Sequence, residues 1–195
     1  NVAPISQTIF DLPGDSQPRL TAKELEPFIL PGAACRLVFV NGRYAPELSD
    51  GEHLPEGVEA GSLADAIRTI PKALEPHLGR YLNTQRDAFC CLNTAFLEDG
   101  GYVHIARGTV VDAPIHLLFL SVKLNGSDRP QMVHPRNLLI VERNAQASIV
   151  EEHISLGLEM STGGVLFANV VTELIAAENS VVSHHMIERE NRKAL

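Results

Sequence analysis

Acidic and imidazole side chains gather in two short segments of the C-terminal third of the sequence. The two segments together contain Glu151, Glu152, His153, His184, His185 and Glu188. Glutamate and histidine that lie two positions apart on adjacent strands can converge on a divalent cation or form an acid–base pair. The first question about this chain is therefore whether these side chains form a catalytic centre.

The alternation of side chains along a strand predicts where the polar groups of the first segment lie. In the favoured register, Val150 and Ile154 face the core. Glu151 and His153 then lie on the outer face of the sheet. Glu152 points inward in this register, and an inward carboxylate needs a partner. We favour this structural interpretation, in which the segment is the polar surface of a sheet.

Two catalytic hypotheses remain as alternatives. The first is a cupin-like metal-dependent enzyme with ligands drawn from His104, His153, His184, Glu151 and Glu188. His104 lies in a segment similar to the His-bearing strand of a cupin, but the second histidine expected two residues later is missing. The second alternative is a sugar-active β-helix, which needs paired carboxylates and aromatic platforms. It is the weaker one, because aromatic residues make up 5% of the chain and tryptophan is absent.

Composition and motifs argue against several other classes. The net charge is −8 and no run of Lys or Arg forms a basic stripe, so the basic footprint of a nucleic-acid-binding protein is missing. No apolar stretch approaches the roughly 20 residues that span a bilayer. Phosphate-loop, dinucleotide-binding, nucleophile-elbow and HExxH motifs are also absent. We therefore predict no catalytic, cofactor-binding or metal-binding residue.

The cysteines indicate the redox compartment. Cys35, Cys90 and Cys91 are an odd number, and the adjacent pair cannot easily bridge to itself. Buried reduced thiols are typical of a reducing compartment. We expect a cytoplasmic protein.

Turn and cap residues predict the elements that position these side chains. Asn41-Gly42 suits the type I′ turn of a hairpin that begins with Leu37–Val40. Ser62, with Asp65 three positions on, predicts the start of a helix. Asp87 predicts the start of a second one.

Residues 101–190 have the character of a repetitive sheet. Residues 143–154 align with residues 178–189 at an offset of 35, which matches Asn144 to Asn179. Asparagine suits the left-handed corner of a tight turn. The segment LEDGGYVHI is a looser third copy, in which glycine would supply the corner.

The repeats predict a fold class. Residues 115–122 are apolar without alternation, which indicates a strand buried on both faces. Long-spaced strand–corner–strand units favour a β-solenoid, with a sandwich as the competing fold. We predict a mainly β chain, with a small mixed α/β segment at residues 1–86 and the solenoid core at residues 87–195.

The order of four segments resembles the SufB/SufD family of iron–sulfur cluster assembly proteins. These segments are LVFVNGRYAPELS, LNTAFLEDGGYVHIARGTVVDAPIHLLFLS, HPRNLLIVERNAQASIVEEH and FANVVTELIAAENSVVSHHMIERE. The resemblance begins at about Cys35 and is greater to the SufD branch, because the cysteine-bearing stretches of the SufB branch are not seen. It implies a right-handed parallel β-helix and a non-catalytic scaffold role.

The resemblance also implies partners. A member of this family pairs with a SufB-like paralogue and a SufC-like ABC ATPase, and the complex handles both the iron–sulfur cluster and ATP. This chain would then bind no cofactor itself. A plastid stroma would replace the cytoplasm if the source is a photosynthetic eukaryote.

The chain departs from the family pattern in length. Family members continue into further β-helix turns and a helical segment that docks the ATPase, so we expect a fragment truncated at its C-terminus. The family's interface histidine belongs to that missing part, and no role is carried over onto His153, His184 or His185. An open solenoid end invites self-association, so a homodimer is possible.

Overall fold

A computed structural model describes residues 3–14, 19–51, 54–82, 87–124, 129–157 and 166–190. The strands are β1 (Cys35–Val40), β2 (Arg43–Tyr44), β3 (Val58–Ser62), β4 (Gly101–Ile105), β5 (Ile115–Val122), β6 (Gln131–Val133), β7 (Arg136–Val141), β8 (Gln146–Leu156), β9 (Leu166–Ala168), β10 (Val171–Ala176) and β11 (Val181–Arg189). The α-helices are α1 (Ala3–Ser6), α2 (Ala22–Leu25), α3 (Leu63–Thr69), α4 (Pro71–Leu74) and α5 (Ala88–Ala95), with 3₁₀ turns at Glu26–Phe28 and Pro46–Leu48. The predicted mainly β class is confirmed.

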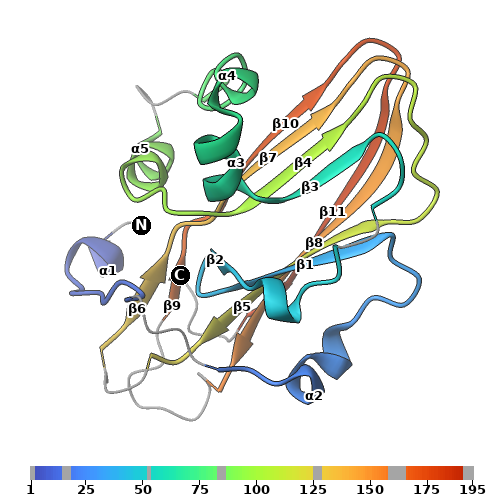
Figure 1. The fold of residues 1–195 in the computed structure, drawn as a ribbon. Coiled ribbons are helices and arrows are strands. Elements are labelled where there is room, and N and C mark those ends of the chain that lie inside the picture. Colours follow the sequence, from blue (N-terminus) through green and yellow to red (C-terminus); the bar gives the residue numbers. More distant parts are fainter. Residues whose placement is uncertain are drawn as a thin grey trace.

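The strands form three sheets. The first has the order β11-β8-β5-β1-β2, the second β10-β7-β4-β3, and β6 pairs with β9 in the third. Pairing is parallel except at the β1–β2 and β3–β4 contacts. From β4 onward the chain visits the three sheets repeatedly in the same order, and Figure 1 shows the two large sheets facing each other.

The register confirms the 35-residue alignment. Val181 of β11 pairs with Gln146 of β8, and the pairing continues residue by residue along both strands. The corners before these strands are Asn144 and Asn179, with φ of 60° and 58°. Both asparagines therefore adopt the left-handed conformation that the alignment predicted.

The predicted third copy is wrong in its placement. The strand that begins at Gly101 pairs with β7, not with β8. The glycine equivalent to Asn144 is Gly108, which has a φ of 75° and lies before the strand that does pair with β8. Apolar strands preceded by a glycine occur at both places, so the sequence alone did not distinguish the two alignments.

Three of the apolar clusters explain how the two large sheets pack. The largest lies between the two large sheets and includes Leu37, Leu117 and Ile149 from one and Val103 and Leu139 from the other. Leu25 of α2 covers the far face of the first sheet, and Leu63 of α3 with Leu74 of α4 covers that of the second. As predicted, β5 is buried on both faces along nearly its whole length.

Local signals predicted the turn and both helix starts correctly. Asn41 and Gly42 have φ of 49° and 82° and connect β1 to β2. The hydroxyl of Ser62 accepts a hydrogen bond of 3.0 Å from the backbone N–H of Asp65. The carboxylate of Asp87 accepts one of 2.9 Å from Phe89.

Some predictions about the whole chain stay open. The domain boundary between residues 86 and 87 stays a prediction, although β1 and β5 pair across it. The solenoid winding also stays a prediction, because the sheets are mixed. Among the described helices, none has both the length and the apolar character needed to cross a bilayer.

Candidate functional site

The inner face of β8 carries Glu151 and His153, contrary to prediction. Glu151 is completely buried and His153 is 5% exposed. Both share the face of Ile149, which packs between the two large sheets. Ile154 instead packs beneath α2 on the outer face. The predicted register failed because both faces of the sheet are covered, so apolar residues mark both of them.

Glu151 is the centre of a hydrogen-bonded group that we call the interior trio: Glu151, His153 and His184. The Nε2 atom of His153 lies 2.9 Å from Oε1 of Glu151, and Nε2 of His184 lies 2.9 Å from Oε2. Thr172 of β10 donates its hydroxyl to Oε2 at 3.0 Å, which links the two large sheets. Both carboxylate oxygens are therefore occupied by groups of this chain.

The surroundings of Glu151 favour its ionised form. Burial alone would raise the pKa of its carboxyl group, but the hydrogen bonds from His153 and His184 act in the opposite direction. Together with the charge of His153 and the hydroxyl of Thr172, they lower the pKa to about 2. Glu151 is a satisfied buried anion rather than a poised general base.

His153 also belongs to a stack of rings inside the fold. Its imidazole is stacked on Phe119 with centroids 4.7 Å apart, and Phe119 is stacked on Phe39 at 4.6 Å. The three residues are register partners on β1, β5 and β8. The ring of His153 therefore continues an aromatic ladder, which is a packing role.

The outer face of β8 carries Glu152, which is 5% exposed. One of its oxygens lies 3.2 Å from Nε2 of His116, and the other lies 3.2 Å from Nε of Arg189. The prediction that Glu152 points inward was wrong. The prediction that its carboxylate needs a partner is confirmed by His116 and Arg189. His116 is fully buried, as a packed residue should be, and burial lowers its pKa.

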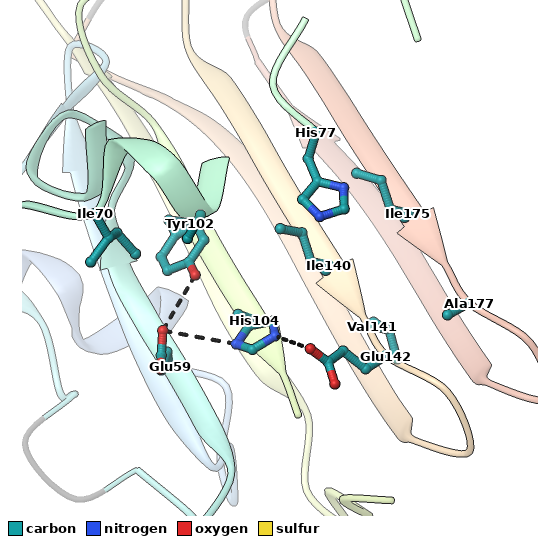
Figure 2. A pocket seen from close by; sticks show the side chains of 11 residues that line it. Glu59, Ile70, His77, Tyr102, His104, Ile140, Val141, Glu142, Ile175 and Ala177 are labelled. Atoms are coloured by element: carbon teal, nitrogen blue, oxygen red, sulfur yellow. Dashed lines mark hydrogen bonds and ion pairs between the residues drawn. The ribbon is translucent and has the colours of Figure 1, made fainter. Parts of the chain in front are cut away.

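His104 lies in a different place, on the outer face of the second sheet (Figure 2). Its Nε2 atom is 3.0 Å from Glu142, and its Nδ1 atom is 3.8 Å from Glu59. The hydroxyl of Tyr102 donates to Glu59 at 3.3 Å. We call Glu59, His104 and Glu142 the pocket trio, because all three line a cavity of about 410 Å³.

Contacts in the pocket trio shift two pKa values. The hydrogen bond from His104 lowers the pKa of Glu142, and the backbone N–H of Arg107 adds to this effect. Burial and the neighbouring Glu59 raise the pKa of Tyr102 to about 12. The carboxylate is therefore charged and the phenol neutral at pH 7.

The rest of the second sequence segment lies at the exposed edge strand β11. His185 faces solvent, and Glu188 lies with His153 and Met186 along a recess of about 130 Å³. The pairing places Glu188 beside His153, as the 35-residue offset predicted. The first sheet thus holds both polar segments, while His104 stands apart on the second.

A metal centre does not assemble from the hypothetical cupin ligands. Across the described ranges, no group of three or more His, Cys, Asp or Glu side chains is arranged to hold a metal ion. The interior trio and His104 belong to different sheets. His153 is hydrogen-bonded to Glu151, whereas His104 is hydrogen-bonded to Glu142. The geometry does not favour the cupin-like hypothesis.

A further buried polar group was missed by the sequence reading. Arg136 and Glu173 form an ion pair of 2.8 Å, and both side chains are 1% exposed. Arg136 also donates to the side chain of Asn93 on α5 at 2.7 Å, and Glu173 accepts from the backbone of Gly79. The available signal was an arginine at the head of the apolar run RNLLIV, because a buried guanidinium requires partners.

Comparison with protein families matches two consecutive regions of the chain. Residues 33–117 match the SufBD protein N-terminal region. Residues 122–195 match the SufBD core domain of SUF system FeS cluster assembly. The two regions together cover every strand described above except the middle of β5, residues 118–121.

Curated proteins similar to this chain are described as iron–sulfur cluster assembly proteins. An iron–sulfur cluster assembly SufBD family protein of Synechocystis sp. is 35% identical over 85% of this chain and 37% of its own length. One from Trieres chinensis is 29% identical over 70% of this chain and 26% of its length. The iron–sulfur cluster assembly protein SufD of Escherichia coli is 27% identical over 80% of this chain and 35% of its length. The chain spans between about a quarter and just over a third of the length of these relatives, and it belongs to the SufBD family.

Proposed function

We propose that this chain is part of a scaffold subunit of the Suf iron–sulfur cluster assembly system. The observation that carries the proposal is the match to both the N-terminal region and the core domain of the family, in that order. Similarity to the SufD protein of Escherichia coli supports the finer assignment to the SufD branch. Its partners would be a SufB-like paralogue and a SufC-like ABC ATPase.

The fold of the scaffold would be a right-handed parallel β-helix. Support comes from the regular return of the chain to the same three sheets, with parallel register offsets of 34 residues between β5 and β8 and 35 between β8 and β11. Stacked coils of this kind bury a continuous core and present long sheet faces. Such faces suit protein contacts better than a closed pocket.

The subunit would act without chemistry of its own. Glu151 and Glu152 both engage side chains of this chain, which leaves neither carboxylate oriented toward a substrate. The iron–sulfur cluster would be the cargo of the complex, and the ATPase partner would hydrolyse ATP. The cytoplasm, or a plastid stroma, stays a prediction for its location.

Affinity purification of the full-length protein from its native cells tests this function. We expect an ABC-type ATPase and a paralogue of this family in the eluate, and neither in a purification from cells with the tag alone. If the recovered paralogue is more similar to the SufD of Escherichia coli than this chain is, this chain would be assigned to the SufB branch instead. Recovery of the full-length protein with neither partner would overturn the scaffold proposal.

A further inference from the structure

The cavity beside the pocket trio has walls of two kinds. Its apolar wall comes from Ile70, Ile140 and Ile175, which are contributed by the end of α3 and by β7 and β10. Its polar wall holds the carboxylates of Glu59 and Glu142 (Figure 2). A volume of about 410 Å³ lies within the range of pockets that bind small ligands.

Apart from its two histidines, His77 and His104, the lining carries charge of one sign. Glu59 and Glu142 line the cavity, and no lysine or arginine is among the lining residues. The charge of Arg107 acts on Glu142 from outside the lining. His104 lies between the two carboxylates and holds them on one side of the cavity. A ligand that enters therefore meets two carboxylates and an apolar surface in the same cavity.

Hydrogen-bonding capacity in the cavity is unfilled at two places. Glu59 accepts from Tyr102 through Oε2 alone, so within the described residues Oε1 remains open to a donor. The Nδ1 atom of His77 is buried and has no hydrogen-bond partner in the described part of the chain. Figure 2 shows His77 close to Ile140 and away from Glu59. A buried polar atom without a partner costs free energy unless a ligand or water satisfies it.

We propose that this cavity binds an alkylguanidinium group, with the cationic head at Glu59 and Glu142 and the alkyl part on the isoleucines. A guanidinium is planar and presents paired N–H donors that match carboxylate oxygens. Its alkyl stem would cover the apolar wall. The group belongs either to a free small molecule or to an arginine side chain of another protein. This site is independent of the proposed scaffold function.

Isothermal titration calorimetry on the full chain with n-butylguanidinium tests the site, with n-butylurea as a neutral probe of the same shape. We expect saturable one-to-one binding of the cation and at least fivefold weaker binding of the urea. Glu59→Gln and Glu142→Gln should each weaken the cation about two- to fivefold, as partly exposed ion pairs do. Glu56→Gln, an exposed glutamate outside the lining, should leave the affinity unchanged.

The source of the guanidinium is distinguished by a further titration with the peptide Gly-Arg-Gly amide. Binding at least as tight as that of n-butylguanidinium assigns the cavity to an arginine of a partner protein. Binding of the free cation alone assigns it to a small molecule. No saturable binding of either probe, or equal binding of cation and urea, overturns the proposal. Far-ultraviolet circular dichroism of each variant shows whether a lost signal reflects unfolding.

Discussion

The interior trio and the pocket trio are built from the same residue types, but the first has a structural role and the second lines a cavity. In the interior trio Glu151 is fully buried, and each of its oxygens lies within 3.0 Å of a side chain of this chain. In the pocket trio the side chains of Glu59 and Glu142 are 63% and 45% exposed. Glu151 is closed to any ligand by its burial. Glu59 and Glu142 face a cavity, although both oxygens of Glu142 also accept hydrogen bonds, from His104 and from the backbone N–H of Arg107.

This difference teaches how to interpret Glu–His clusters in a repetitive sheet. Glutamate and histidine make up both trios, so residue type does not separate a structural group from a binding group. Burial combined with complete hydrogen bonding indicates a structural role, because a substrate would have to break existing contacts. Partial exposure beside unfilled space indicates a binding role.

The largest expected effect comes from removing the centre of the interior trio. Glu151→Leu should lower the free energy of unfolding by about 3–5 kcal/mol, because His153, His184 and Thr172 lose their shared acceptor. Urea denaturation followed by circular dichroism measures it. Glu178→Leu, at an exposed corner, is the matched control and should cost less than about 1 kcal/mol. Equal costs for the two variants would remove the distinction.

Acid should abolish the contribution of Glu151. Its folded pKa of about 2 lies below the unfolded value of 4.5, so its stabilisation is complete above pH 4.5 and disappears as the pH falls toward 2. The linked free energy is about 3 kcal/mol. The stability difference between the unmodified chain and Glu151→Gln should be constant from pH 5 to 7 and should shrink below pH 4.5. A difference that stays constant down to pH 3 would contradict this account.

An intermediate effect is expected at His153. His153→Phe keeps a ring on Phe119 but removes the hydrogen bond to Glu151, so it should cost about 1–3 kcal/mol. Urea denaturation at pH 7 gives the value. His185→Phe, on the exposed face of β11, provides the comparison and should be nearly neutral. A stabilising His153→Phe would show that the ring matters and the imidazole does not.

The smallest effect on stability is expected in the pocket trio. Glu142→Gln should change the free energy of unfolding by less than about 1 kcal/mol, because partly exposed ion pairs contribute little. Thermal and urea unfolding both report it. A loss above about 2 kcal/mol would mean that the pocket trio stabilises the fold as the interior trio does.

Local chemistry in the sequence predicted much of the frame. Asn144 and Asn179 revealed the register of β8 and β11, because only a few residue types accept the left-handed corner. Ser62 and Asp87 marked helix starts through caps that depend on neighbouring residues alone. Features that depend on contacts between residues a few positions apart in the chain can be predicted from a single sequence.

Features set by long-range packing were not predictable in this way. The inner face of β8 was misidentified because α2 buries the outer face too. An apolar residue such as Ile154 is therefore compatible with either face. Arg136 and Glu173 are 37 positions apart and meet only through the β7–β10 pairing. Gly100 lies so close to the backbone of Arg136 that any Cβ would collide with it, a constraint invisible before the sheets are assembled.

The most direct test of the contrast between the two trios is urea unfolding at pH 7 of Glu151→Gln beside Glu142→Gln. Each substitution replaces one carboxylate by its neutral isostere, so shape is preserved and only charge and hydrogen bonding change. We predict that Glu151→Gln loses at least about 2 kcal/mol more than Glu142→Gln. Equal losses, or a greater loss for Glu142→Gln, would contradict the assignment of the interior trio to the fold and of the pocket trio to binding.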